Sequence, residues 1–143
     1  MRRQHLLNIG IALLILLYSY TAISKFLDQY RFVFQMKLSP FSLVKNFAPL
    51  WGWFIPVTEI GIVLGLCFEK SQKKALIISL GLLSIFEIYI VGMLMTGLKL
   101  PCACGGVIAF MSWKVHVLFN AIFITINILT IRFSKGERLA TYS

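Results

Sequence analysis

The most reactive side chains of the sequence form a closely spaced cysteine pair. Cys102 and Cys104 stand in the run LPCACGG at positions 100–106. Two thiols separated by one residue can close a small, strained disulfide that exchanges readily with another thiol. Pro101 and the two glycines permit the tight backbone that such a ring needs. The pair predicts thiol–disulfide exchange, with Cys102 and Cys104 as the catalytic residues.

Two other uses of this pair stay open. The cysteines could form a passive disulfide that only ties a loop, or their thiolates could bind a soft metal such as Cu(I) or Zn(II). The further metal ligands nearest in the sequence are His116, Met93, Met95 and Met111. No complete metal site is predicted from these residues. The third cysteine, Cys67, is interpreted as a small buried apolar residue.

A second group of candidate residues is polar but lies inside apolar stretches. Glu59 and Glu87 each interrupt such a stretch, and His116, Asn120 and Asn127 recur on one face of a helix. A charged side chain in lipid is costly, so each carboxylate should face other helices, either paired or protonated. We interpret Glu59, Glu87, His116 and Asn120 as a candidate cofactor site for protons or a quinone. The alternative is interhelical hydrogen bonding that fixes the packing.

The composition defines the elements that must position these residues. The chain has 143 residues, of which 59% are apolar and 13% are charged, whereas soluble domains are about 45–50% apolar and about 25% charged. A soluble domain and a disordered chain are therefore excluded. Four apolar stretches approach the roughly 20 residues that a membrane-spanning helix needs. They cover residues 6–24, 50–68, 75–98 and 115–133, and predict a single four-span domain over residues 1–143, an all-α four-helix bundle.

The positive charge has a membrane explanation. The formal charge of +9 would point to nucleic acid in a soluble protein. Here most basic residues flank the apolar stretches, as expected beside anionic lipid headgroups, so lipid and not nucleic acid is the predicted partner. The side that holds both termini carries eight basic residues: Arg2, Arg3, Lys70, Lys73, Lys74, Arg132, Lys135 and Arg138. The opposite side carries six: Lys25, Arg31, Lys37, Lys45, Lys99 and Lys114. The larger set predicts that both termini are cytoplasmic and that the cysteines face the periplasm of a bacterial inner membrane.

The first predicted periplasmic loop, residues 25–49, is too long for a simple hairpin. Ser39 and Pro40 predict a helix start, and the apolar spacing that follows predicts a short surface amphipathic helix ending near Pro49. Trp51, Trp53 and Trp113 lie near the outer ends of predicted spans, as in an aromatic belt.

Several of these features occur together in a known family. Lys25 follows a tyrosine-rich first span, Pro56 and Glu59 lie in the second, and the run CACGG is followed by MSWK at positions 111–114. This arrangement resembles the DoxX-like superfamily of small four-span membrane proteins, and more specifically its MauE (methylamine utilisation) branch. The resemblance implies a role in disulfide formation or maturation of exported proteins, with a thioredoxin-like periplasmic partner. It assigns the exchange chemistry to Cys102 and Cys104.

We therefore predict a membrane thiol–disulfide redox or maturation factor. One thiolate of the pair attacks a disulfide of the partner or exported substrate, a mixed disulfide forms, and the second thiol resolves it. Positive charge from Lys99, Lys114 and a protonated His116 would favour the attacking thiolate. The alternatives are a non-catalytic subunit or assembly factor of a larger membrane complex, with a structural disulfide, and a soft-metal handling protein.

Overall fold

The computed structural model describes residues 1–98 and 112–141, with side chains described as far as residue 135. Every regular element in this part of the chain is an α-helix. In chain order the helices are α1 (Arg2–Leu27), α2 (Gln29–Lys37), α3 (Ser42–Asn46), α4 (Ala48–Cys67), α5 (Glu69–Thr96) and α6 (Trp113–Thr141). Four of them, α1, α4, α5 and α6, are long and apolar enough to cross a membrane. The predicted all-helical, four-span architecture is confirmed for the described residues.

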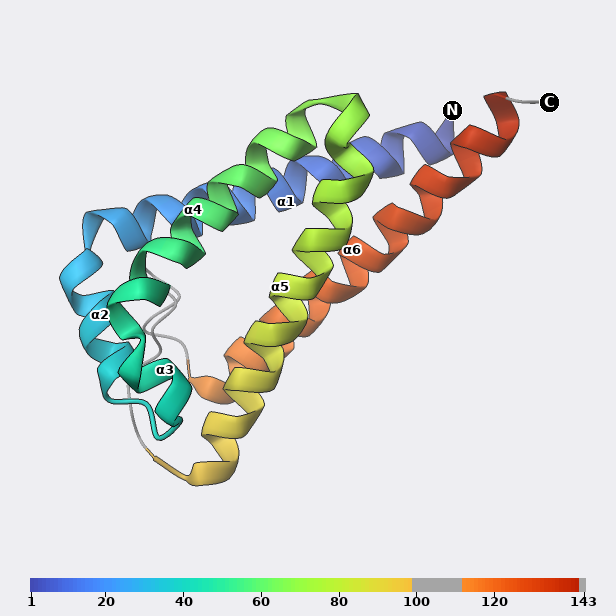
Figure 1. Cartoon of the computed structure of the whole chain (residues 1–143). Helices are drawn as coiled ribbons and strands as arrows, with labels where there is room; N and C mark the ends of the chain where they lie inside the picture. Colours follow the sequence, from blue (N-terminus) through green and yellow to red (C-terminus); the bar gives the residue numbers. More distant parts are fainter. Residues whose placement is uncertain (99–111, 142–143) are drawn as a thin grey trace.

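The four long helices pack in a closed order. Helix α1 contacts α4 and α6, and α5 contacts the same two helices. Both termini lie at one end of the molecule, together with the junction between α4 and α5 (Figure 1). From that end the pair α1/α4 and the pair α5/α6 diverge, and α2 and α3 lie at the far end (Figure 1). The two termini are therefore on the same side of the bundle.

The junction between α4 and α5 is tighter than the apolar stretches indicate. A single extended residue, Phe68, separates the two helices. Ser71 Oγ donates to the carbonyl of Gly65 at 2.9 Å, and Gln72 Nε2 donates to the carbonyl of Leu66 at 3.1 Å. These bonds satisfy carbonyls at the end of α4 that have no partner within the helix. The lysines expected in this loop, Lys70, Lys73 and Lys74, belong instead to the first turns of α5.

The segment between the first two spans is more helical than predicted. The expected short helix is present as α3, but it ends before Pro49, which lies in the first turn of α4, where its missing N–H costs nothing. Helix α2 was not predicted. It buries Phe32 and Met36, which pack with Ala48 and Ile55 of α4.

A proline in α4 provides an acceptor for α2. Pro56 lies inside the helix and has no N–H to donate to the carbonyl of Gly52. Gln29 Nε2 of α2 donates to that carbonyl at 2.9 Å. The approach is close because residue 52 has no side chain: a Cβ there would overlap Val33 Cγ2. Pro56 and Gly52 together allow α2 to pack against α4.

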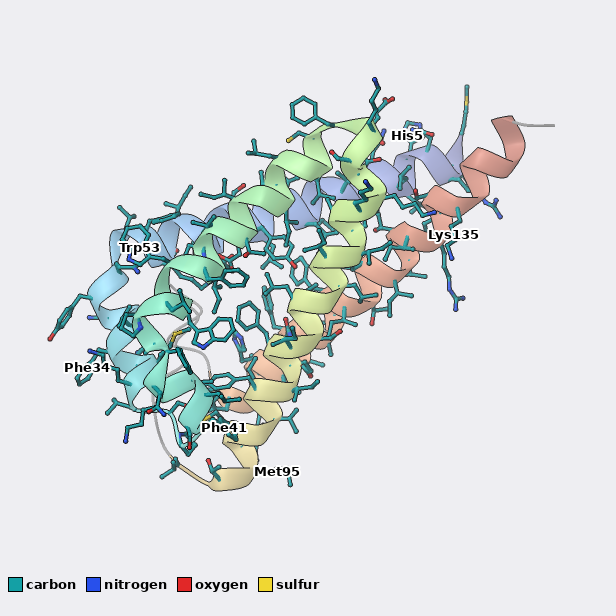
Figure 2. The ribbon with its side chains drawn as sticks, viewed as in Figure 1. His5, Phe34, Phe41, Trp53, Met95 and Lys135 are labelled. Carbon is teal, nitrogen blue, oxygen red and sulfur yellow. The ribbon has the colours of Figure 1, made fainter. Side chains whose placement is uncertain are left out.

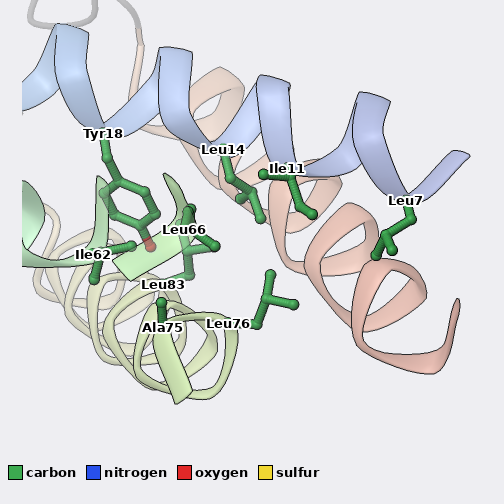
Figure 3. Close-up of a cluster of buried hydrophobic side chains, with 9 residues drawn as sticks. All are labelled: Leu7, Ile11, Leu14, Tyr18, Ile62, Leu66, Ala75, Leu76 and Leu83. Atoms are coloured by element: carbon green, nitrogen blue, oxygen red, sulfur yellow. The ribbon is translucent and has the colours of Figure 1, made fainter. Parts of the chain in front are cut away.

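The main core takes its fully buried side chains from three of the long helices, and partly buried side chains of the fourth, α6, pack against it. Leu7, Ile11, Leu14 and Tyr18 point from one face of α1 toward the other helices (Figure 3). They follow the helical repeat and pack with Ile62, Leu66, Ala75, Leu76 and Leu83 of α4 and α5.

A buried serine connects three helices by hydrogen bonds. The Tyr18 hydroxyl lies 2.9 Å from Ser79 Oγ, and Asn127 Nδ2 donates to the same Oγ at 2.6 Å. All three side chains are buried, which confirms that Asn127 faces the bundle interior. In lipid, such bonds and close packing hold helices together, because the hydrophobic effect does not act between them.

Small residues set the spacing of two helix pairs. Gly10 of α1 faces Thr130 of α6, whose hydroxyl oxygen occupies the space where a Cβ would lie and whose Cβ and methyl carbon would each lie 3.3 Å from it. A Cβ at Gly65 of α4 would lie 2.8 Å from the Cβ of Ala75 in α5. Close backbone approach through small residues is typical of helix packing in membranes.

The Gly10 contact gives a direct test of the packing. We expect Gly10→Ala to lower the free energy of unfolding by about 1–3 kcal/mol, because the whole Thr130 side chain must move. Gly61 of α4 is the matched control, since a Cβ there meets nothing within 4 Å. Gly61→Ala should be neutral or stabilise by up to about 1 kcal/mol. Denaturant titration of the two variants in detergent micelles measures both effects, and equal losses would contradict the α1–α6 contact.

Candidate functional site

A buried ion pair lies in the bundle interior. Lys25 Nζ lies 2.8 Å from Glu59 Oε1, and the two side chains are only 3% and 1% exposed. Lys25 is in the last turn of α1, and Glu59 is in the middle of α4. The prediction that Glu59 faces the interior, either paired or protonated, is confirmed, and the structure shows the paired form.

The placement of Lys25 in a periplasmic loop was wrong. Its side chain shares one face of α1 with the buried residues Tyr18 and Thr21, at helical steps of three and four. An ionised carboxylate inside a span is costly without a cation, and pairing with Glu59 stabilises Lys25 inside the bundle. A lysine in helical register with a polar face, combined with a glutamate in the next span, was the sequence signal that could have identified the pair.

The Lys25 ammonium is surrounded by protein groups from several helices. Besides Glu59, Nζ donates to the carbonyl of Thr21 at 3.5 Å. It lies 5.6 Å from the ring centroid of Phe32 in α2 and 5.8 Å from that of Phe86 in α5. At these distances the ring faces attract the cation. The second carboxylate oxygen, Glu59 Oε2, is buried and accepts no hydrogen bond from the described residues.

A cavity of about 250 Å³ adjoins the ion pair. All six helices contribute to its wall, which is mostly apolar and rich in aromatic rings, including Phe32, Trp51, Phe86, Tyr89 and Phe119. Its polar groups include Lys25 and Glu59, with Tyr18 and Thr21 from α1 and with His116 and Asn120 from α6. The cavity therefore combines a ring-lined interior with a small number of charged and polar groups, as ligand pockets do.

The structure brings together three of the four residues predicted for a cofactor site. Glu59, His116 and Asn120 are buried and line the cavity. Glu87 does not line it. Its Oε2 accepts a hydrogen bond from Asn120 Nδ2 at 2.9 Å, and Asn120 also donates to the carbonyl of Leu83 at 3.0 Å. Glu87 thus makes the interhelical hydrogen bond that was its alternative interpretation, and holds Asn120 at the cavity.

Sequence reasoning also missed the aromatic wall. Trp51 was predicted in an aromatic belt, but it lines the cavity, and its Nε1 donates to the carbonyl of Leu43 in α3 at 3.3 Å. Trp53, two residues further along α4 and labelled in Figure 2, is 59% exposed, and its ring centroid lies 6.1 Å from that of Phe26 in α1. Residues two apart on a helix point to nearly opposite sides, so one tryptophan faces the cavity and the other faces outward.

The predicted catalytic cysteines, Cys102 and Cys104, lie outside the described residues. The helices on either side of them are described. Helix α5 ends at Thr96 with Gly97 in the left-handed conformation (φ 67°), and α6 begins at Trp113. The last turns of α5 and the first turns of α6 carry Tyr89, Ile90, His116 and Asn120, which line the cavity. The two helices that the cysteine-bearing connection joins therefore both line the cavity.

The remaining sulfur ligands do not converge in the described part. Cys67 is exposed at the last position of α4, so its predicted burial is wrong. Met93 is buried whereas Met95 is 84% exposed, which places them on different sides of α5. Among residues 1–98 and 112–135, no three His, Cys, Asp or Glu side chains are grouped as metal ligands.

The ion pair makes a strong stability prediction. We expect Glu59→Leu to lower the free energy of unfolding by about 3–5 kcal/mol, because it leaves the buried Lys25 without a counter-ion. The double variant Lys25→Met/Glu59→Leu should recover most of this loss. The matched control is Thr58→Ala, which removes a hydroxyl that bonds only to the carbonyl of Phe54 in its own helix. Denaturant titration in micelles measures all three, and a single-variant loss equal to that of the control would contradict the pairing.

The comparisons with known proteins agree with this architecture. A family model described as methylamine utilisation protein MauE matches residues 3–133. The match covers the membrane-crossing helices, the ion pair and the cysteine run. No curated protein and no solved structure matches the chain. With nearly its whole length matched, the chain belongs to the MauE family, within the DoxX-like superfamily of small membrane proteins.

Proposed function

We propose that this MauE family protein is a membrane thiol–disulfide redox or maturation factor. In this proposal Cys102 and Cys104 exchange with a thioredoxin-like periplasmic partner or an exported substrate. The observation that carries it is that α5 and α6, the helices joined by the cysteine-bearing connection, both line a mostly apolar cavity with a few polar and charged groups. This arrangement supports a protein in which exchange at the surface is paired with a binding site between the helices.

The proposed orientation places both termini in the cytoplasm of a bacterial inner membrane. Pairing of Lys25 with Glu59 removes one basic residue from the opposite side, which leaves five there against eight on the terminal side. The exposed Lys70 and Lys74 at the start of α5 add to the positive charge near the termini. The positive-inside rule then directs the cysteines to the periplasm, where disulfides persist.

The exchange step transfers electrons and protons between the two proteins, and their numbers balance. A partner thiolate attacks the disulfide of Cys102 and Cys104 and forms a mixed disulfide, which the second partner thiol breaks. Two electrons and two protons leave the partner, which becomes oxidised, and the cysteine pair becomes a dithiol. The same steps run in reverse when the partner arrives as a disulfide.

The first two described basic residues that follow the cysteine pair in the sequence differ in how well they could assist thiol exchange. Lys114, at the start of α6, is exposed and can approach the connection that precedes it. His116 is buried and lines the cavity, so it is better placed to contact a bound molecule than a surface thiol. Repeated cycles require a two-electron carrier, for which a quinone is the candidate and the cavity is the candidate site.

Thiol trapping in intact cells tests the location and redox state of the pair. On the Cys67→Ser background, a membrane-impermeant maleimide should label Cys102 and Cys104 from outside, and only after prior reduction. Wild type provides the control for labelling at Cys67. Labelling that requires permeabilisation would contradict the orientation, and a pair that is always reduced would favour metal binding or a structural role.

A cysteine variant tests the exchange itself. With an oxidised partner, Cys104→Ser should accumulate the mixed disulfide on Cys102, because the thiol of Cys104 is no longer there to resolve it. With a reduced partner, turnover should fall to the background level, because the variant has no disulfide for the partner thiolate to attack. Cys67→Ser is the matched control and should leave turnover unchanged. The readout is the redox state of the partner, measured by alkylation and gel shift. An unchanged partner redox state with Cys102→Ser/Cys104→Ser would instead favour an assembly role.

A further inference from the structure

We propose that the cavity beside Lys25 and Glu59 binds an uncharged ring that carries a hydroxyl group, of the hydroquinone class. The ring alcohol follows from the cavity itself. The choice of a hydroquinone among ring alcohols rests on the proposed redox function, which requires a two-electron carrier.

The charge of the site favours an uncharged ligand. Lys25 and Glu59 neutralise each other at 2.8 Å. A charged ligand would bring an additional unpaired charge among membrane-crossing helices, where unpaired charge is costly. The cavity wall is mostly apolar, so it offers little to compensate such a charge.

The unmet hydrogen-bonding capacity favours a hydroxyl group. Glu59 Oε1 accepts from Lys25 and the Thr21 hydroxyl interacts with the same carboxylate, but no described donor lies within hydrogen-bond geometry of the buried Oε2. A buried carboxylate oxygen without a donor is costly, so a donor from a ligand would stabilise the site. A hydroxyl group can donate to Oε2 and accept from Lys25 Nζ, whereas a quinone carbonyl can only accept. The reduced ring therefore satisfies both members of the pair, and the oxidised ring satisfies one.

The shape of the cavity favours a ring. Its volume of about 250 Å³ equals roughly eight water molecules at their share of liquid volume, which suits a substituted six-membered ring. Trp51, Phe86, Tyr89 and Phe119 present aromatic surfaces on several sides. Such surfaces pack well against another ring and give water few partners. The location between membrane-crossing helices suits a ligand that dissolves in lipid.

The two tryptophans of α4 provide a matched pair of reporters. Trp51 lines the cavity, whereas Trp53 points outward. The protein is placed in phosphatidylcholine nanodiscs with Trp51 as its sole tryptophan, through Trp53→Phe and Trp113→Phe. Decylubiquinone should quench Trp51 saturably. In the version that retains only Trp53, quenching should rise with the amount of quinone in the lipid, without saturation.

Competition between the two redox forms tests the hydroxyl argument. Decylubiquinol should displace decylubiquinone with an affinity about tenfold higher, since it adds a hydrogen bond to a charged acceptor. The paired variant Lys25→Met/Glu59→Leu should lose this preference, and Thr58→Ala should keep it. Unsaturable quenching of Trp51, or equal affinities of the two forms for the unaltered pair, would overturn the proposal. The latter comparison needs no change at Lys25 or Glu59, so it holds even when the paired variant fails to fold.

The binding assay separates this proposal from the proposed function. It is carried out with Cys67→Ser, Cys102→Ser and Cys104→Ser present, so that no thiol can react with the quinone. Ring binding with failed partner exchange would contradict only the redox role of the cysteines. Partner exchange without ring binding would contradict only the cavity assignment.

Discussion

An ionised carboxylate in the middle of a membrane-crossing helix is costly without a cation, and the pairing of Glu59 with Lys25 organises the interior of the protein. Glu59 of α4 meets Lys25 of α1 at 2.8 Å, so the two helices are joined by an ion pair that is almost fully buried. Rings from α2 and α5 surround the ammonium and complete its desolvation. Because the pair is neutral as a whole, the bundle can hold it in an apolar setting.

The other half of the bundle depends on uncharged polar contacts. Ser79 of α5 connects Tyr18 of α1 with Asn127 of α6, and Asn120 connects α6 with Glu87 of α5. These bonds and the close approach of Gly10 to Thr130 replace the hydrophobic drive that soluble bundles have. The helix pairs diverge toward the far end (Figure 1). There the polar side chains, which include His116 and Asn120, line a cavity between the helices.

The arrangement relates the two sets of residues that carry chemistry. The connection with Cys102 and Cys104 joins the ends of α5 and α6, whose nearest turns line the cavity with Tyr89, His116 and Asn120. Helices α2 and α3 contribute Phe32, Met36 and Val44 to the same wall. Pro56 helps to hold α2 at this wall, because it has no N–H for the Gly52 carbonyl and that carbonyl accepts a hydrogen bond from Gln29 of α2. The match to the MauE family covers all of these residues.

Sequence by itself determined the all-helical class, the four spans, the burial of Glu59, His116, Asn120 and Asn127, and the family, because these follow from local periodicity and short motifs. The tertiary structure decided which groups meet. It paired Lys25 with Glu59, turned Trp51 inward, exposed Cys67, placed Glu87 outside the cavity and formed α2. Hydrophobic patterns show that a residue faces other helices, but the partner depends on how separate helices pack, and that packing joins residues far apart in the chain.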